Sequence, residues 1–177
     1  MELTPFIYKL LPKLADIGSF VALKGSYEIA QCDKGPRSFL LDGGILYDLN
    51  LVNTGGAVFI SGTAVAHAHG ECDRCLAPAQ LELTGEVETY VVLGARGSDN
   101  QDKIDDCLVA DDKDASIDLA PLIFSAVILA IPPIVLCRED CAGLCPGCGA
   151  HLNEEPCSCS VDSVDENHPF AALKDLL

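Results

Sequence analysis

The cysteines in the last quarter of the chain are the residues whose types and spacing could do chemistry. Six of the 10 cysteines fall between positions 137 and 159, at Cys137, Cys141, Cys145, Cys148, Cys157 and Cys159. The run Cys145-Pro-Gly-Cys148-Gly149 has the form of a metal knuckle, in which two sulfurs lie on a tight turn and glycines let backbone N–H groups approach them. A segment this short buries little surface of its own, so a bound ion would supply the folding free energy that a core cannot.

Four ligands are needed for a tetrahedral zinc site, usually as two close pairs. The partner of the Cys145/Cys148 pair is either Cys157/Cys159 or Cys137/Cys141, and the short loop after the knuckle favours Cys157/Cys159. Two zinc ions with bridging sulfurs, or an iron–sulfur cluster, are alternatives for six thiolates. Four thiolates leave no open coordination position, so we expect a structural zinc ion, about one per chain.

A second C-x-x-C lies at Cys72-Asp-Arg-Cys75. It is either half of a second metal site, with Arg74 favouring thiolate at each sulfur, or a structural turn, or a redox dithiol. A redox dithiol normally lies where a strand enters a helix, and the sequence here predicts strands on both sides, which argues against that chemistry.

The charge of the chain is strongly negative, with 27 acidic against 11 basic residues and a net charge of −16. Such a chain repels a phosphate backbone, because binding of nucleic acid depends on Lys and Arg. We therefore expect a basic protein, metal ions or no charged partner at all, and weak or no binding to naked nucleic acid. An RNA-binding patch would have to come from the bases of the N-terminal third, which are Lys9, Lys13, Lys24, Lys34 and Arg37.

The start of the chain lacks the features of a secretory signal, which are a basic start, a long apolar stretch and a cleavage site of small residues. A cytoplasmic, reducing location is therefore expected. In such a location clustered cysteines bind metals rather than form disulfides. The uncharged stretch from Leu119 to Leu136 resembles a membrane span. Pro132 and Pro133 would end a helix there, and residues 119–131 span only about 20 Å against the ~30 Å of a bilayer core. We expect a buried core helix and no membrane contact.

The predicted fold is α+β. Residues 38–93 look extended, with alternation over 45–52 and many Val, Ile, Thr and small residues over 57–69, and they favour an antiparallel β-meander or a partly closed barrel. A turn is expected at 72–77, and a helix over 119–131 would cover the sheet. In the last strand, Leu81, Leu83, Val87 and Val91 would face inward, with Gly85 at a bulge.

Two domains are expected, a β-rich domain over 1–133 and a small cysteine-rich zinc-binding segment over 134–177. The first would begin with a short helix over 3–15 and include a flexible acidic linker over 94–117. The second would end in a short helix over 169–177.

From about residue 40 to 177 the chain resembles the YceD family, which is associated with accumulation of the large-subunit (23S) ribosomal RNA. The motifs that carry this resemblance are Cys72-Asp-Arg-Cys-Leu76 between strands, Ile117-Asp-Leu119 before the helix, the run 136–149, Leu152-Asn153, Cys157-Ser-Cys159 and Pro169-Phe-Ala-Ala-Leu173. The resemblance implies a role in large-subunit rRNA processing or stability and in ribosome assembly, with no established catalytic activity. Some family members lack the six-cysteine segment, which implies that the segment is a stabilising or docking module in the branch that has it.

The function expected from these features is that of a non-enzymatic assembly factor that binds a basic ribosomal protein or a pre-ribosomal particle. The alternatives are a direct rRNA-binding protein, a thiol oxidoreductase using Cys72 and Cys75, or a nuclease. No Ser or Cys nucleophile has an identifiable base and orienting acid, so no catalytic residue is predicted.

Overall fold

The computed structural model describes residues 3–10, 13–92, 108–109 and 116–159. By internal contacts the chain divides into two compact units, unit 1 (Met1–Gly70 and Gln80–Pro133) and unit 2 (Glu71–Ala79 and Ile134–Leu177). The elements found in the described residues are β1 (Ile7–Lys9), β2 (Phe20–Tyr27), β3 (Gln31–Lys34), β4 (Arg37–Asn53), β5 (Ala57–Glu71), β6 (Pro78–Val92), β7 (Leu108–Val109), β8 (Ser116–Asp118) and α1 (Ala120–Ala130).

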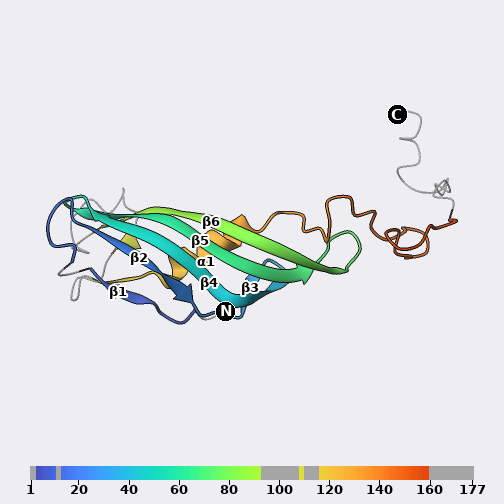
Figure 1. The fold of residues 1–177 in the computed structure, drawn as a ribbon, viewed down its shortest axis with the longest axis horizontal. Coiled ribbons are helices and arrows are strands. Elements are labelled where there is room, and N and C mark those ends of the chain that lie inside the picture. Colours follow the sequence, from blue (N-terminus) through green and yellow to red (C-terminus); the bar gives the residue numbers. More distant parts are fainter. Residues whose placement is uncertain (1–2, 11–12, 93–107, 110–115, 160–177) are drawn as a thin grey trace, which may run out of the picture. The chain divides into compact units, whose positions relative to one another are not determined.

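The main sheet is a meander. Its strands follow the order β2-β4-β5-β6-β7, with β3 also paired to β4 (Figure 1). The pairs of β4 with β2, β3 and β5 are antiparallel, and β7 adds to β6 in parallel. The predicted antiparallel meander is confirmed, but the described strands leave the sheet open, with β2 and β7 at its edges, so they form no closed barrel.

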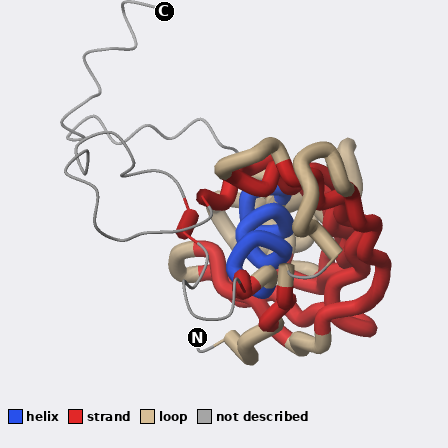
Figure 2. Tube along the Cα trace, turned by 90° about the vertical axis from the view of Figure 1, so that its left-hand side faces the viewer, coloured by secondary structure: helices blue, strands red, loops and turns tan. Residues whose placement is uncertain are grey.

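One face of the sheet is buried against α1 (Figure 2). Along β6 the odd-numbered positions alternate with exposed ones, and Leu83, Gly85, Val87 and Val91 are buried whereas Leu81 is only half-buried. Gly85 lies where the helix comes closest, because a Cβ at this position would stand 2.1 Å from the carbonyl oxygen of Ala126. The missing side chain therefore lets the helix backbone rest directly on the strand.

The longest strand, β4, changes register at a pair of glycines. Its pairing with β5 shifts between Asp42 and Leu46, and Gly43 and Gly44 there have φ of 73° and 75°. A Cβ on Gly44 would stand 2.4 Å from the carbonyl oxygen of Tyr27. This irregularity bends the strand without breaking it.

The predicted helix over 3–15 is wrong, because this segment enters a sheet. Ile7–Lys9 pairs antiparallel with β8, and the N–H of Phe6 donates to a carboxylate oxygen of Asp118 at 2.8 Å. Pairing with a strand more than 100 residues away overrides the local helical pattern.

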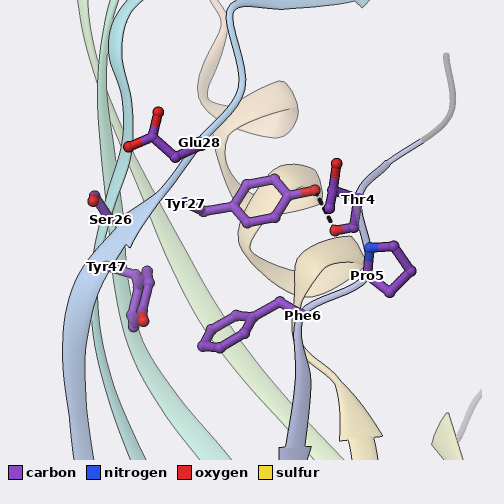
Figure 3. Close-up of a pocket in the computed structure, with 7 residues that line it drawn as sticks. All are labelled: Thr4, Pro5, Phe6, Ser26, Tyr27, Glu28 and Tyr47. Atoms are coloured by element: carbon purple, nitrogen blue, oxygen red, sulfur yellow. Dashed lines mark hydrogen bonds between the residues drawn. The ribbon is translucent and has the colours of Figure 1, made fainter.

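An aromatic hollow of about 230 Å³ lies beside this N-terminal segment (Figure 3). The ring of Phe6 packs at 5.5 Å from that of Tyr47, and the hydroxyl of Tyr27 donates to the carbonyl of Thr4 at 2.7 Å. Glu28 is the one carboxylate among the residues that line this hollow.

The predicted core helix is confirmed as α1, an 11-residue helix with Ala120, Ile123, Ala126 and Val127 buried. The N-cap residue of α1 is Leu119, and the carboxylate of the preceding Asp118 accepts a hydrogen bond from the N–H of Ala120 at 3.0 Å. Among the described residues, no helix has the length and apolar character to cross a membrane.

The segment predicted as an acidic linker over 94–117 is in part strand. Leu108–Val109 forms β7, and Ser116 and Ile117 begin β8. The rest of that segment, and the predicted helix over 169–177, lie outside the described residues.

Replacing Gly85 by Ala should destabilise unit 1, because the new methyl group would collide with the backbone of α1. We expect a loss of about 1–3 kcal/mol in the free energy of unfolding, as for other overpacked cores. Gly56→Ala is the matched control, since a Cβ there meets nothing within 4 Å. Urea unfolding compares the two variants, and equal midpoints would show that α1 does not rest on β6 at this point.

Candidate metal centre

Unit 2 brings together eight cysteines in two groups of four. The buried group consists of Cys72, Cys75, Cys137 and Cys141, and the exposed group consists of Cys145, Cys148, Cys157 and Cys159. Within each group all sulfur atoms lie within 4.8 Å of one another. Among the described residues these are the clusters of metal-ligating side chains with such spacing.

The buried group joins the hairpin between β5 and β6 to the segment after α1. The Sγ atoms of Cys72 and Cys141 lie 3.8 Å apart, and those of Cys75 and Cys137 lie 3.6 Å apart. Cys137 is the half-exposed member of the group, and the other three are buried. Each thiol of the C-x-x-C therefore lies beside a sulfur from the later segment.

The exposed group is more local in sequence. The Sγ of Cys157 lies 3.3 Å from that of Cys145 and 3.4 Å from that of Cys148. Cys148 and Cys159 are exposed, whereas Cys145 is buried. The N–H of Gly147 donates to the Cys145 sulfur at 3.4 Å, which is the backbone approach expected of a metal knuckle.

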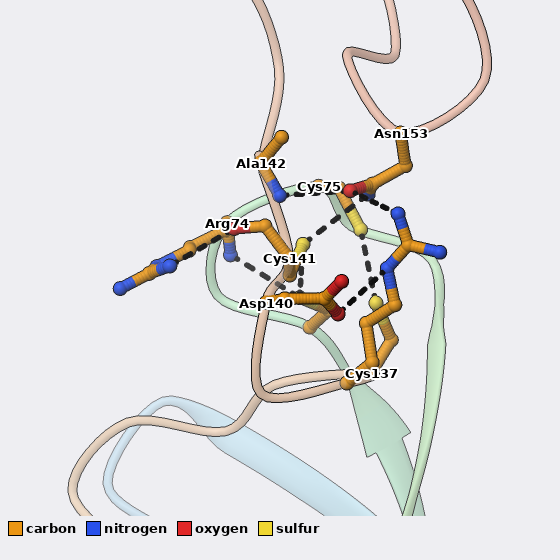
Figure 4. A network of polar contacts seen from close by, with 9 residues as sticks. Arg74, Cys75, Cys137, Asp140, Cys141, Ala142 and Asn153 are labelled. Carbon is orange, nitrogen blue, oxygen red and sulfur yellow. Dashed lines mark hydrogen bonds and ion pairs between the residues drawn. The ribbon is translucent and has the colours of Figure 1, made fainter.

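Polar side chains hold the segments of the buried group (Figure 4). The guanidinium of Arg74 donates to the carbonyl of Cys141 at 2.9 Å. The amide of Asn153 donates to the Cys141 sulfur at 3.3 Å, and its oxygen accepts from the N–H of Ala142 at 2.7 Å and from Arg138 at 2.9 Å. These bonds orient the Cys141 thiol as second-sphere groups orient metal ligands in proteins.

One thiol in each group is set up to lose its proton. Burial raises the pKa of Cys72, but donors led by the N–H of Arg74 outweigh it and bring the pKa to about 6. The backbone N–H groups of Cys148 and Gly147 lower the pKa of Cys145 to about 6. Each group thus holds a thiolate near neutral pH.

Another thiol in each group resists ionisation. Burial and the neighbouring thiol of Cys75 raise the pKa of Cys137 to about 12. The thiols of Cys157 and Cys148 raise the pKa of Cys159 to about 12. A second negative charge would lie beside the first, and a divalent cation is the chemical partner that removes this repulsion.

The cysteines that the sequence offered as ligands divide between the two groups. The preferred pairing of the knuckle with Cys157 and Cys159 is the arrangement found, while Cys137 and Cys141 lie with the C-x-x-C at 72–75. Arg74 contributes backbone and guanidinium hydrogen bonds and no ligand atom to the buried group. The imidazole of His151, which lies in the loop between Cys148 and Cys157, is in neither group.

Sequence reasoning missed two features of the centre. It left open what would join the C-x-x-C at 72–75, and it gave no role to Asn153 in the site. The signal for the first was the equal spacing of the two C-x-x-C turns, each followed two residues later by Ala, at Ala77 and Ala150.

Asn153→Ala should raise the pKa of the Cys141 thiol, because the amide of Asn153 is the largest influence that lowers it. In the reduced, metal-free protein, the pH profile for alkylation of Cys141 should move to higher pH, as read residue by residue by mass spectrometry. Asn50→Ala, an exposed change on β4, should leave the profile in place. A profile that stays or moves to lower pH in Asn153→Ala would contradict the assigned hydrogen bond.

Comparison with known proteins agrees with the motifs. An uncharacterized protein of Mycobacterium bovis and another of Mycobacterium tuberculosis are each 37% identical to the chain over 128 residues, covering 69% of this chain and 59% of the relative. An uncharacterized protein of Mycobacterium leprae is 27% identical over 160 residues, covering 87% of this chain and 70% of the relative.

The chain thus spans about 59% of the length of the first of these relatives. No solved structure gives a significant match. The family model described as large ribosomal RNA subunit accumulation protein YceD matches residues 60–177, which include all eight clustered cysteines. Because this match covers well over half of the sequence, the chain belongs to the YceD family, whose name implies a role in accumulation of large-subunit ribosomal RNA.

Proposed function

We propose that this protein is a non-enzymatic factor that supports accumulation and processing of large-subunit (23S) rRNA by binding a basic ribosomal protein or a pre-ribosomal particle. The family membership supports the process. The single observation that supports a basic partner is an acidic, partly apolar face of the main sheet, which no described element covers. We call it the outer face.

The outer face consists of the even-numbered positions of β6 and the odd-numbered positions of β5. Along β6 these positions alternate with the buried ones that face α1. Across the strands, the ring of Phe59 lies 4.7 Å from that of Tyr90, which places both side chains on this face. Helix α1 rests on the opposite side, at Gly85.

Carboxylates dominate the charge of the outer face. Glu82, Glu86 and Glu88 are exposed on β6, and none of them makes an ion pair with another described residue. Their charge is therefore available to a partner. Basic side chains of a ribosomal protein complement it, and the net charge of −16 would steer such a partner from a distance.

Exposed apolar side chains lie on the same side of the sheet, on β6 and on β4, where Leu40 and Leu46 pair with His69 and Val65 of β5. Tyr90 is 52% exposed, and Leu46 and Leu40 on β4 are 55% and 61% exposed. Exposed aromatic and aliphatic groups beside charges are typical of protein–protein interfaces. The combination suits a protein with Lys or Arg beside apolar groups better than a bare phosphate backbone.

Direct rRNA binding has less support. Of the N-terminal bases, Lys24 makes an ion pair with Asp48 at 2.6 Å, and Lys34 donates to the carbonyl of Ile131 at 2.5 Å. Binding to naked RNA would need such bases to contact phosphates.

We propose zinc as the ion of the exposed group. Cys145, Cys148, Cys157 and Cys159 supply four sulfurs, which suits one structural zinc with no open position for substrate. The ion would hold the turn-rich segment after α1 in one shape. This chemistry requires reduced thiols, in line with a cytoplasmic location.

We propose no catalytic activity for the chain. A redox dithiol at Cys72 and Cys75 has little support, since the sulfurs of these residues lie beside those of Cys141 and Cys137 and the turn is followed by β6 instead of a helix. Reduction of insulin by the purified protein would revive that alternative. Cleavage of precursor rRNA would revive the nuclease.

Charge reversal on the outer face should weaken binding to the basic partner. Glu86→Lys with Glu88→Lys should lower the amount of protein that sediments with large-subunit particles by about tenfold or more, since like charges at an interface cost several kcal/mol. Cells that carry this variant as their only copy should show a lower ratio of 23S to 16S rRNA.

The matched control is Glu154→Lys with Glu155→Lys, which makes the same change in net charge at exposed positions of unit 2. It should sediment with the particles and restore the rRNA ratio. If both pairs behave alike, the outer face is not the docking surface. If the wild-type protein binds naked rRNA tightly at about 150 mM salt, direct RNA recognition replaces this proposal.

A further inference from the structure

The turn at Cys72–Ala77 has the backbone hydrogen bonds of the metal knuckle at Cys145–Ala150. In both turns the N–H of the first cysteine donates to the alanine carbonyl five residues later, at 2.9 Å and 2.8 Å. In both, the N–H of the residue after the second cysteine donates back to the carbonyl of the first cysteine, at 2.9 Å and 2.8 Å.

The match extends to the sulfur atoms. The N–H two residues after the first cysteine donates to its sulfur, from Arg74 at 3.5 Å and from Gly147 at 3.4 Å. N–H groups aimed at a sulfur stabilise a thiolate, which is the form that binds a metal. The two turns therefore present their first sulfur in the same way.

Leu76 has a backbone conformation that side chains seldom adopt. Its φ is 60°, and among the described residues it is the one non-glycine residue with a positive φ. The equivalent residue of the exposed knuckle is Gly149, with a φ of 74°. Leu76 is 63% exposed, so packing of its side chain does not explain why the backbone is held in this form.

The distances between sulfurs fit one tetrahedral ion. Metal–sulfur bonds of about 2.3 Å in a tetrahedron separate the sulfurs by about 3.8 Å. In the buried group the Cys72–Cys141 and Cys75–Cys137 separations are 3.8 Å and 3.6 Å. All four donors are sulfur, which suits zinc or another soft divalent cation over calcium or magnesium.

We infer that Cys72, Cys75, Cys137 and Cys141 bind a second metal ion, a soft divalent cation of the zinc class, at a site separate from the exposed group. The ion cross-links a hairpin to a segment that follows it by more than 60 positions, since the paired cysteines are 69 and 62 residues apart. This inference rests on the same cysteine chemistry as the zinc proposed above, but it does not require the ribosomal partner. The experiment below counts the ions of the two groups separately.

Burial should make this ion the slower of the two to leave. Three of its four ligands are buried, whereas Cys148 and Cys159 of the exposed group face solvent. A chelator reaches the exposed group first. Release of metal should therefore occur in two resolved steps of equal size.

The experiment counts metal ions by native mass spectrometry on the full chain, purified under reducing conditions and reloaded with zinc. The wild-type protein should carry two ions. Cys137→Ser and Cys159→Ser, one in each group, should each carry one ion. Cys32→Ala should carry two, because Cys32 is a buried cysteine of β3 outside both groups.

Release to a chelator identifies which ion each variant retains. Cys159→Ser should show only the slow step, and Cys137→Ser only the fast step. Cys137→His should regain the slow step, because imidazole can replace the half-exposed thiolate as a zinc ligand. One ion in the wild-type protein, or an unchanged ion count in Cys137→Ser, would overturn the inference. Loss of both ions from Cys137→Ser, with no recovery in Cys137→His, would overturn the separateness of the two sites.

Discussion

Repulsion between closely spaced sulfurs is the constraint on which the structure of unit 2 depends. Four thiols within 4.8 Å of one another cannot all ionise unless a cation lies among them. Burial and the neighbouring thiols raise the pKa of Cys137 to about 12, while the burial of Cys72 is outweighed by backbone donors that lower its pKa to about 6, so the group favours one thiolate beside a neutral thiol. The divalent ion that we propose for each group would replace this repulsion with four metal–sulfur bonds, and it would give a segment with little regular structure a fixed shape.

The two units obtain their stability from different sources. Unit 1 has a conventional core between one face of the meander and α1, with Gly85 allowing the closest approach. In unit 2 the described residues after Pro133 form no helix and only an isolated bridge between Leu144 and His151. With the proposed ions bound, metal–sulfur bonds would have in unit 2 the role that apolar burial has in unit 1.

The sequence predicted those features that depend on local patterns. The Val, Ile and Thr content of 57–69 and the inward-facing set of 81–92 predicted the meander strands, and the apolar run closed by Pro132 predicted α1. The knuckle at Cys145 and Cys148 was recognisable because all its elements lie within five residues. The exposed group could be assembled from sequence for the same reason, since its pairs are about a dozen residues apart.

Long-range pairings could not be read from the sequence. The strand Ile7–Lys9 owes its form to β8, more than 100 residues later, so its helical pattern was misleading. The C-x-x-C at Cys72 and Cys75 had no assigned partner because Cys137 and Cys141 were also candidates, although not the preferred ones, for the nearer knuckle. Asn153 was part of a family motif, but its role could not be assigned, since an Asn that donates to a distant sulfur has the same local context as one on a turn.

The atoms around the metal test the account most directly. X-ray absorption at the zinc edge, on protein purified without added metal, measures which atoms surround the ion and at what distance. The account predicts a shell of four sulfurs at about 2.3 Å. A shell dominated by nitrogen or oxygen, or a protein that carries no zinc and whose clustered thiols all react freely, would contradict it.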